Sequence, residues 1–139
     1  MVTKDTLIRG GKNSLTVTWE LSKYVVPVYI LVTFLKYTPV LNWISERTSG
    51  LMVVVGLPGA ASVPLVMGYT LNIYAAIGAM GPLELNTKQI TIMAGMLLLA
   101  HSLPVEGAIS KKTGVRISGL ICLRIFLSFI TGAFINLLF

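Results

Sequence analysis

The sequence predicts an all-α integral membrane protein with about four transmembrane elements, including a re-entrant or broken helical hairpin. Hydrophobic residues make up 55% of the 139 residues and charged residues only 12%, whereas soluble domains are roughly 25% charged. The mean hydropathy is +0.83. The apolar residues gather in runs long enough for helices of about 20 residues to cross a bilayer. We therefore expect the apolar surface to face lipid.

The composition also argues against several classes of function. The net charge of +6 comes from basic residues beside apolar runs, a pattern typical of membrane anchoring. No basic stripe with interleaved aromatic residues predicts nucleic-acid binding. Cys122 is the only cysteine, so we expect no intramolecular disulfide and no Cys/His metal site. Five acidic residues, with no catalytic triad or phosphate loop, argue against an enzyme or a bound cofactor.

Residues 1–22 form the first unit and residues 23–139 a single transmembrane domain. The first unit is polar and mixed, and we interpret it as an amphipathic segment lying on the membrane surface. Gly10 and Gly11 are expected to break it into two short pieces, and a loose solvated tail is the alternative. No apolar stretch precedes a small-residue cleavage site, so no cleavable signal peptide is expected.

The first strong apolar run covers residues 23–44. Its one internal charge, Lys36, could extend to the membrane surface. Pro39 is expected to end or kink the helix. The polar stretch 45–50 then predicts a loop.

Residues 51–80 contain no charge, and Gly and Pro interrupt their first half. Two interpretations compete. One is a single long helix with an irregular start. The other is a re-entrant hairpin whose two half-helices are joined by the Gly/Pro turn, which is tolerated at membrane depth only where protein or a water cavity covers it. The residues expected to mark the breaks are Gly56, Pro58, Gly59 and Pro64.

The second half of the chain predicts a loop, a broken helix and a last span. Residues 81–88 read as a loop in which Asn86 or Thr87 could cap the next helix. Residues 88–109 begin as a helix that Pro104 is expected to interrupt. A basic turn at residues 110–114 leads to the last span, residues 115–139.

The distribution of basic residues tests the topology. Basic residues concentrate on the cytoplasmic side of membrane proteins, and here they flank both ends of the chain: Lys4, Arg9, Lys12 and Lys23, then Lys111, Lys112 and Arg116. Four simple spans would place the two groups on opposite faces, whereas a re-entrant hairpin at 51–80 places them on one face. Insertion in both orientations, with an antiparallel dimer, is the other solution.

Glu106 is the most informative candidate for a solute or ion path. An acid within a span costs about 2.5–3.5 kcal/mol on insertion scales, and Glu106 follows a proline break of the kind at which transporters bind substrate. Position at the membrane surface beside Lys111 and Lys112 is the alternative. His101 could relay protons or bond a neighbouring helix, and Ser102 lies beside it.

Other polar residues could line the same path. Ser62, Thr70 and Asn72 follow the Gly/Pro turn, although such side chains also bond their own helix or a neighbour. Arg124 could pair with Glu106 of this or a partner subunit, or with a lipid phosphate. Small residues at Gly95, Gly119 and Gly132 are expected to allow close helix packing.

The motif Gly56-Leu57-Pro58-Gly59, followed by the break His101-Ser102-Leu103-Pro104-Val105-Glu106, resembles the nucleoside recognition, or gate, domain family. That family includes spore maturation proteins A and B and gate regions of Feo-type ferrous-iron and concentrative nucleoside transporters. The resemblance covers about residues 20–138. It implies a gate-like transport repeat, a hairpin plus a broken helix, often paired with an inverted partner. The cysteines of iron gates are missing, which makes iron less favoured.

The functional hypothesis is a half-sized transport unit in the cell (cytoplasmic) membrane. It moves a small polar solute, for which a nucleoside-like molecule is one candidate. Such a short chain encloses a solute poorly, so we expect a homodimer, with an antiparallel form as one version, or a heteromer with a related gate protein. The alternative is a non-transporting subunit that scaffolds or gates a partner membrane protein. The expected partners are therefore the lipid bilayer, a second gate chain and the solute.

Overall fold

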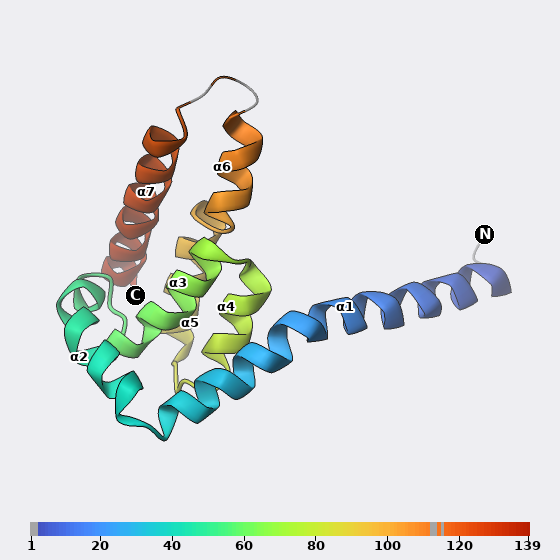
Figure 1. Cartoon of the computed structure of the whole chain (residues 1–139), viewed down its shortest axis with the longest axis horizontal. Helices are drawn as coiled ribbons and strands as arrows, with labels where there is room; N and C mark the ends of the chain where they lie inside the picture. The colour runs from blue at the N-terminus through green and yellow to red at the C-terminus, as the bar shows by residue number, and fades with distance from the viewer. Residues whose placement is uncertain (1–2, 112–113, 115) are drawn as a thin grey trace.

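The computed structural model describes residues 3–111, 114 and 116–139, and every regular element among them is helical. Figure 1 shows their arrangement. The elements are α1 (Lys4–Lys36), α2 (Pro39–Val54), the 3-10 turn η1 (Gly59–Ala61), α3 (Ser62–Thr70), α4 (Ile73–Met80), α5 (Thr87–Leu99), α6 (Leu103–Lys111) and α7 (Ile117–Leu138). The all-α class is confirmed.

Three segments are long and apolar enough to cross a membrane: α1, the combined stretch Thr87–Lys111, and α7. A fourth is reached if α2 and the stretch Gly59–Thr70, which are bent by 91° at their junction, count as one broken span. The chain is thus a multi-pass membrane protein with three to four candidate spans, as its composition predicts.

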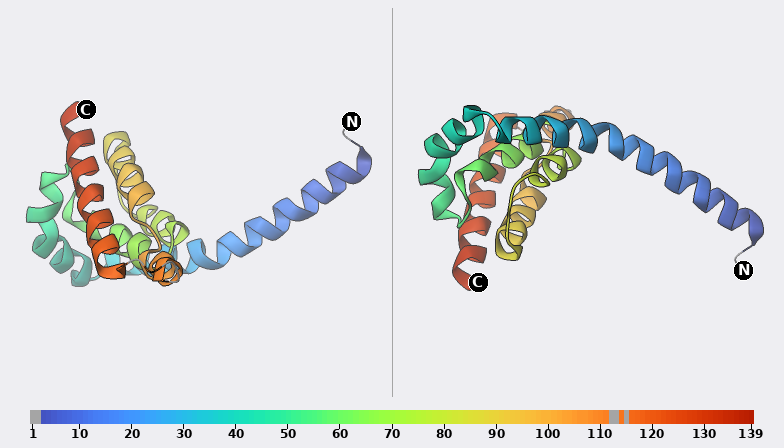
Figure 2. Two further views of the ribbon diagram at one scale, coloured as in Figure 1. Left: turned by 90° about the horizontal axis from the view of Figure 1, so that it is seen from above. Right: turned by 90° about the horizontal axis from the view of Figure 1, so that it is seen from below.

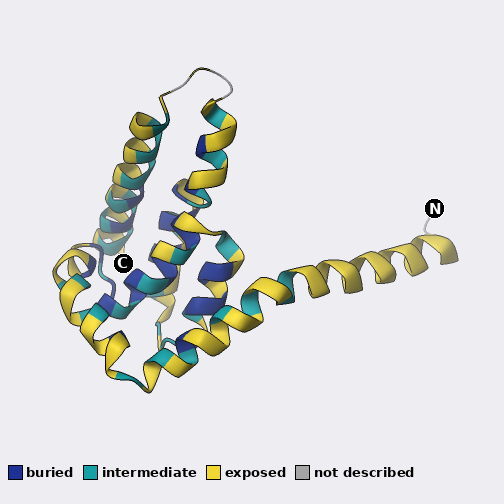
Figure 3. Ribbon diagram, viewed as in Figure 1, coloured by how far each residue is buried: buried dark blue, intermediate teal, exposed yellow. Residues whose placement is uncertain are grey.

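α1 is continuous, so the break expected at Gly10 and Gly11 is wrong. Ser14 Oγ donates to the carbonyl of Gly10 at 2.9 Å, and the helix begins at a Thr3 cap. Each further residue adds a hydrogen bond to a helix that is already nucleated, so a long helix tolerates two glycines. The N-terminal half projects away from the body and is exposed along its length (Figures 1 to 3). The boundary expected at residues 22 and 23 lies inside α1 and stays a prediction.

Pro39 separates α1 from α2, as expected. The residue before a proline is driven out of the α region, and Thr38 has an extended backbone while Pro39 opens α2. The loop expected at 45–50 is wrong, because these residues are helical. Thr48 Oγ1 donates to the carbonyl of Ile44 at 2.8 Å and Ser49 Oγ to that of Glu46 at 2.8 Å, which pairs the polar side chains within the helix.

Residues 51–80 do not form one long helix, so that interpretation is wrong. α2 ends at Val54. If the helix continued, the ring of Pro58 would clash with the carbonyl of Val54, four residues earlier. Gly56 has φ of +75°, and the amide of Leu57 donates to the carbonyl of Met52. These are features of a Schellman ending, in which the chain leaves a helix with its last carbonyls paired.

α3 and α4 form an antiparallel hairpin, but its tip is not the Gly/Pro turn. The tip lies at Leu71 and Asn72, and Asn72 Oδ1 accepts from the amide of Ala75 at 2.9 Å to cap α4. A Cβ on Gly68 would meet the Cβ of Ala76 at 3.1 Å, which places these two residues opposite each other across the tip. The Gly/Pro turn instead joins α2 to η1.

α5 and α6 together run antiparallel to α7 (Figures 1 and 2). A Cβ on Gly95 would meet Ile135 at 2.6 Å, and one on Gly107 would meet Ile117 at 2.9 Å, so the contact line extends across the break. Gly132 packs on Met96, which confirms close packing there and at Gly95, whereas a Cβ on Gly119 would meet open space. Asn86, one of the two residues expected to cap α5, does so in a full capping box.

α1 runs parallel to α4 and completes the body. A Cβ on Gly78 would meet the backbone of Val25, and one on Gly81 would meet the ring of Tyr29. Figure 3 shows the buried residues concentrated on the short central helices. Much of the core comes from α5, as Ile92, Met93, Met96 and Leu97. Of the basic turn, Lys111 ends α6, whereas Lys112 lies outside the described residues.

Candidate functional site

The break between α5 and α6 is a consequence of Pro104. In a continuous helix the ring of Pro104 would clash with the carbonyl of Ala100, and α5 ends at Leu99. Ser102 then takes a φ of +47°, a region that non-glycine residues seldom occupy. Its amide donates to the carbonyl of Gly68 at 2.9 Å, and its carbonyl accepts from the amide of Glu106 at 3.0 Å. The tip of the α3–α4 hairpin therefore holds the break.

Arg124 of α7 connects both sides of the break. Its Nε donates to the carbonyl of Leu99 at 2.7 Å, at the end of α5. Its Nη1 donates to Oε2 of Glu106, in the first turn of α6. Of the pairings considered from the sequence, the one within the same chain is present. The side chains of Arg124 and Glu106 are 21% and 34% exposed, so the pair is accessible from outside the helices.

His101 lies on the other oxygen of the same carboxylate. Its Nδ1 is 2.9 Å from Oε1 of Glu106, although the direction is not that of a hydrogen bond and the nitrogen itself is buried. With His101 neutral, the cluster of Arg124, Glu106 and His101 has no net charge, and protonation of His101 would make it positive. The alternative position of Glu106, at the membrane surface beside Lys111 and Lys112, stays a prediction.

A second, fully buried link joins α7 to α5 one turn away. Ser128 Oγ donates to the carbonyl of Met96 at 2.9 Å and lies 2.6 Å from the hydroxyl of Tyr69 in α3. Because Ser128 is completely buried, an unpaired hydroxyl there would cost free energy, and this chain of bonds avoids that cost. Arg124 and Ser128, spaced i and i+4 on α7, thus satisfy two carbonyls of the last turns of α5.

The structure gathers part of the expected site and separates the rest. His101, Ser102, Pro104 and Glu106 lie together at the α5–α6 break. Ser62 is elsewhere, where its Oγ is 3.1 Å from Thr48 Oγ1 of α2. Asn72 is occupied as the cap of α4. The residues expected to mark the first break, Gly56, Pro58, Gly59 and Pro64, lie at or just after the joint between α2 and α3.

Sequence reasoning missed Tyr69 and Ser128. The signal for Ser128 was its spacing of four residues from Arg124 in an otherwise apolar helix, because such polar residues share one helix face. Tyr69 gave no comparable signal, since its partner is 59 residues away. No group of three or more His, Cys, Asp or Glu side chains lies together within the part of the chain that the structure describes.

The amino-acid sequence is similar to that of known proteins. The profile of the Gate family, described as nucleoside recognition, matches residues 18–116 and so ends just before α7. An uncharacterized membrane protein, YvoD, of Bacillus subtilis (strain 168) is 37% identical over 135 residues, which is 97% of this chain. The chain spans 43% of the length of that relative. No solved structure matches the chain significantly.

The candidate spans and the membrane-protein relative both indicate a multi-pass membrane protein. The profile covers more than half of the chain, and the chain therefore belongs to the nucleoside recognition (Gate) family.

Proposed function

We propose that this chain is one half of a transport unit of the cell membrane that moves a small polar solute past the α5–α6 break. The observation that carries the proposal is the accessible ion pair of Arg124 and Glu106 at an interrupted helix. Interrupted helices near the membrane midplane are where secondary transporters bind their substrates. A nucleoside-like solute is the first to test, because the family is described by nucleoside recognition.

The tip of the α3–α4 hairpin supports the same site. The carbonyl of Gly68 accepts from the amide of Ser102, so the hairpin and the break form one unit. Irregular backbone at membrane depth is stable only where protein or a water-filled cavity surrounds it. Two irregular segments in contact satisfy that condition for each other and leave polar groups for a solute.

The proposed topology has α3 and α4 as a re-entrant hairpin. α1 runs parallel to α4, α5 leads away from the same end, and α7 returns to it. This path puts the basic residues of early α1 and the segment around Arg116 on one face, which fits the preference of basic residues for the cytoplasmic side. The bent pair of α2 and α3 as a crossing span is the competing topology.

A dimer or a heteromer completes the proposed unit. Only 11% of the apolar window of α7 is buried within the chain. A second gate-like copy against α7 would surround the break on its open side. An antiparallel copy would provide the inverted pairing common in transporters.

A non-transporting subunit is the second candidate, and one observation favours it. Arg124 bonds the backbone of Leu99 as well as Glu106, so the pair also has a purely structural use in closing the break. Copurification with a stoichiometric partner membrane protein would favour this candidate over the first.

Uptake by the purified chain in liposomes tests the proposal. Tritiated uridine and adenosine are the probes, and Glu106→Gln is the variant. We expect saturable uptake by the wild type, and uptake by Glu106→Gln at the level of empty liposomes. Glu46→Gln is the matched control, since Glu46 is an exposed acid on α2 outside the break. Uptake that Glu106→Gln leaves unchanged would show that the break is not the path.

Cysteine labelling from one side of the membrane tests the topology. In a Cys122→Ser background, single cysteines replace Gly50, Glu84 and Gly114. A re-entrant hairpin requires the first two to label from one face and the third from the other. Labelling of positions 50 and 84 from opposite faces would replace the hairpin by a crossing span.

A further inference from the structure

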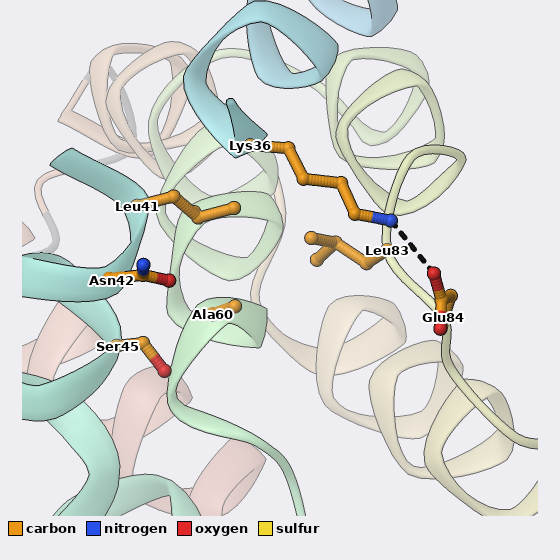
Figure 4. Close-up of a pocket in the computed structure, with 7 residues that line it drawn as sticks. All are labelled: Lys36, Leu41, Asn42, Ser45, Ala60, Leu83 and Glu84. Atoms are coloured by element: carbon orange, nitrogen blue, oxygen red, sulfur yellow. Dashed lines mark hydrogen bonds and ion pairs between the residues drawn. The ribbon is translucent and has the colours of Figure 1, made fainter. Parts of the chain in front are cut away.

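A cavity of about 270 Å³ lies at the opposite end of α5 from the break, at the α4–α5 loop. Figure 4 shows its lining, which comes from the end of α1, the first turns of α2, η1 and the loop after α4. Leu41 and Leu83 provide apolar walls. The polar lining residues are Lys36, Asn42, Ser45 and Glu84. None of these belongs to the break between α5 and α6.

Lys36 is the cationic group of this cavity. Its Nζ donates to Oε1 of Glu84 at 2.9 Å and to the carbonyl of Pro82 at 3.3 Å. An ammonium has three N–H donors, so one donor stays available. Its anionic partner is held weakly, because the Glu84 side chain is 92% exposed on a loop, where water competes for an ion pair.

Two further polar side chains of the cavity lack internal partners. Asn42 and Ser45 form no side-chain hydrogen bond with any residue that the structure describes. They lie on the side of the cavity opposite Glu84 (Figure 4). The helical segment that starts at Gly59 begins beside them, and the positive end of its dipole adds to the charge of Lys36.

We propose that this cavity binds a small phosphate-type anion, for which the carboxylate of Glu84 is a tethered substitute. The anion replaces Glu84 on Lys36 and receives a hydrogen bond from Ser45, with Asn42 beside it. Such binding is independent of transport through the α5–α6 break, and the proposal stands even if the chain moves no solute.

The anion could be free phosphate or the phosphate of a lipid headgroup. The nearby rings of Tyr37 and Trp43 are 85% and 60% exposed, and aromatic residues of this kind collect at the headgroup level of a bilayer. The recognition chemistry is the same for both sources, so the experiment separates them.

The rate at which charged reagents modify a cysteine in the cavity reports the charge of the cavity. In the full chain with Cys122→Ser and Asn42→Cys, we compare the rates at which an anionic and a cationic methanethiosulfonate modify the thiol. Glu84→Gln should raise the ratio of anionic to cationic rate about fivefold, as expected from removing one nearby charge in a watery site. Glu20→Gln, which removes the same kind of partner from Lys23 on the free half of α1, should leave the ratio unchanged.

Protection then identifies the ligand. The reagent is the uncharged methyl methanethiosulfonate, so that membrane charge does not affect its local concentration. Inorganic phosphate, added in neutral detergent, should slow labelling of the thiol introduced by Asn42→Cys if the ligand is free. Nanodiscs of phosphatidylglycerol, compared with phosphatidylcholine, should slow it if the ligand is a lipid.

Two controls keep the result specific. Gly50→Cys reports an open position on the same helix and should show no protection, and Lys36→Gln should abolish the protection of the thiol in the cavity. Protection by either phosphate source, lost in Lys36→Gln, supports the proposal. An unchanged rate ratio in Glu84→Gln together with no protection from either source overturns it.

Discussion

The break after α2 and the break after α5 differ in what closes them. The break after α2 is closed by its own backbone, with a left-handed Gly56 and the amide of Leu57 on the carbonyl of Met52. The break after α5 places a serine in the left-handed region and depends on Arg124 and Ser128 of another helix. The first is a fixed turn of 91°. The second is caused by Pro104, and its polar groups are paired by side chains of α7.

The largest expected effect sharpens the first half of this comparison. A Cβ on Gly59 would lie against the backbone carbonyl of Ser45, which cannot rotate away. Gly59→Ala should therefore lower the free energy of unfolding by about 3 kcal/mol, the upper range for overpacking. Thermal unfolding in detergent measures it. Gly50→Ala is the control, because its Cβ would meet open space on α2, and this substitution should stabilise the chain slightly. Equal effects would mean that the joint between α2 and η1 is not tightly packed.

The second prediction concerns the break that α7 closes. Arg124→Gln leaves Glu106 without its cation and removes a bond to the Leu99 carbonyl. The loss should be about 2 kcal/mol, less than for a fully buried pair because both side chains are partly exposed. Glu106→Gln in the same chain should restore part of that loss. Additive losses in this double-mutant cycle would show that the two residues do not interact.

The third prediction tests whether Ser102 is strained. Because its φ is +47°, Ser102→Gly should stabilise the chain by up to about 1 kcal/mol, whereas Ser102→Val should destabilise it by more than that. Chemical denaturation of both variants measures the difference. A stability ranking with valine above glycine would contradict the left-handed geometry of the second break.

The smallest effect is expected outside both breaks, at the cavity near Lys36. The hydrogen bond from Lys36, followed by its charge, holds the pKa of the Glu84 carboxyl below its ordinary value of 4.5. A lowered pKa means that the pair stabilises the fold above pH 4.5 and that this contribution is lost as pH falls through the folded-state pKa. The thermal midpoint of the wild type should therefore exceed that of Glu84→Gln at pH 7, and the gap should close in acid. A gap that widens in acid would contradict this sign.

The local chemistry of proline and asparagine could be predicted from the sequence. Pro39 and Pro104 interrupt helices as expected, since the clash of the ring involves only the preceding turn. Asn86 caps α5 for an equally local reason. The break that carries the candidate site was therefore visible in the sequence, together with its acid and its histidine.

The errors came from polar residues whose partners lie within the same helix. The stretch 45–50 resembles a loop in composition, but hydroxyl groups that bond the preceding turn keep it helical. The hairpin tip was misplaced for a related reason. The Gly/Pro turn looked like the stronger signal, whereas the actual tip needs only Asn72 as a cap.

The pairs between residues far apart in the sequence could not be predicted. Arg124 with Glu106 was one of several alternatives, and the structure selects it. Tyr69 with Ser128 and Lys36 with Glu84 are separated by 59 and 48 residues. Such pairs depend on how the helices pack, and no periodicity along the chain indicates them.

The unbroken helix α1 is longer than the bilayer core is thick. Its 33 residues measure about 50 Å at 1.5 Å each, while the hydrocarbon core is only about 30 Å thick. If Lys36 marks one surface and the helix is upright, about 20 Å must emerge on the other side as a rigid rod. Tilting shortens that rod but drives the charged turns near Asp5 and Arg9 sideways along the headgroups. The angle of α1 therefore sets whether this end meets water or lipid.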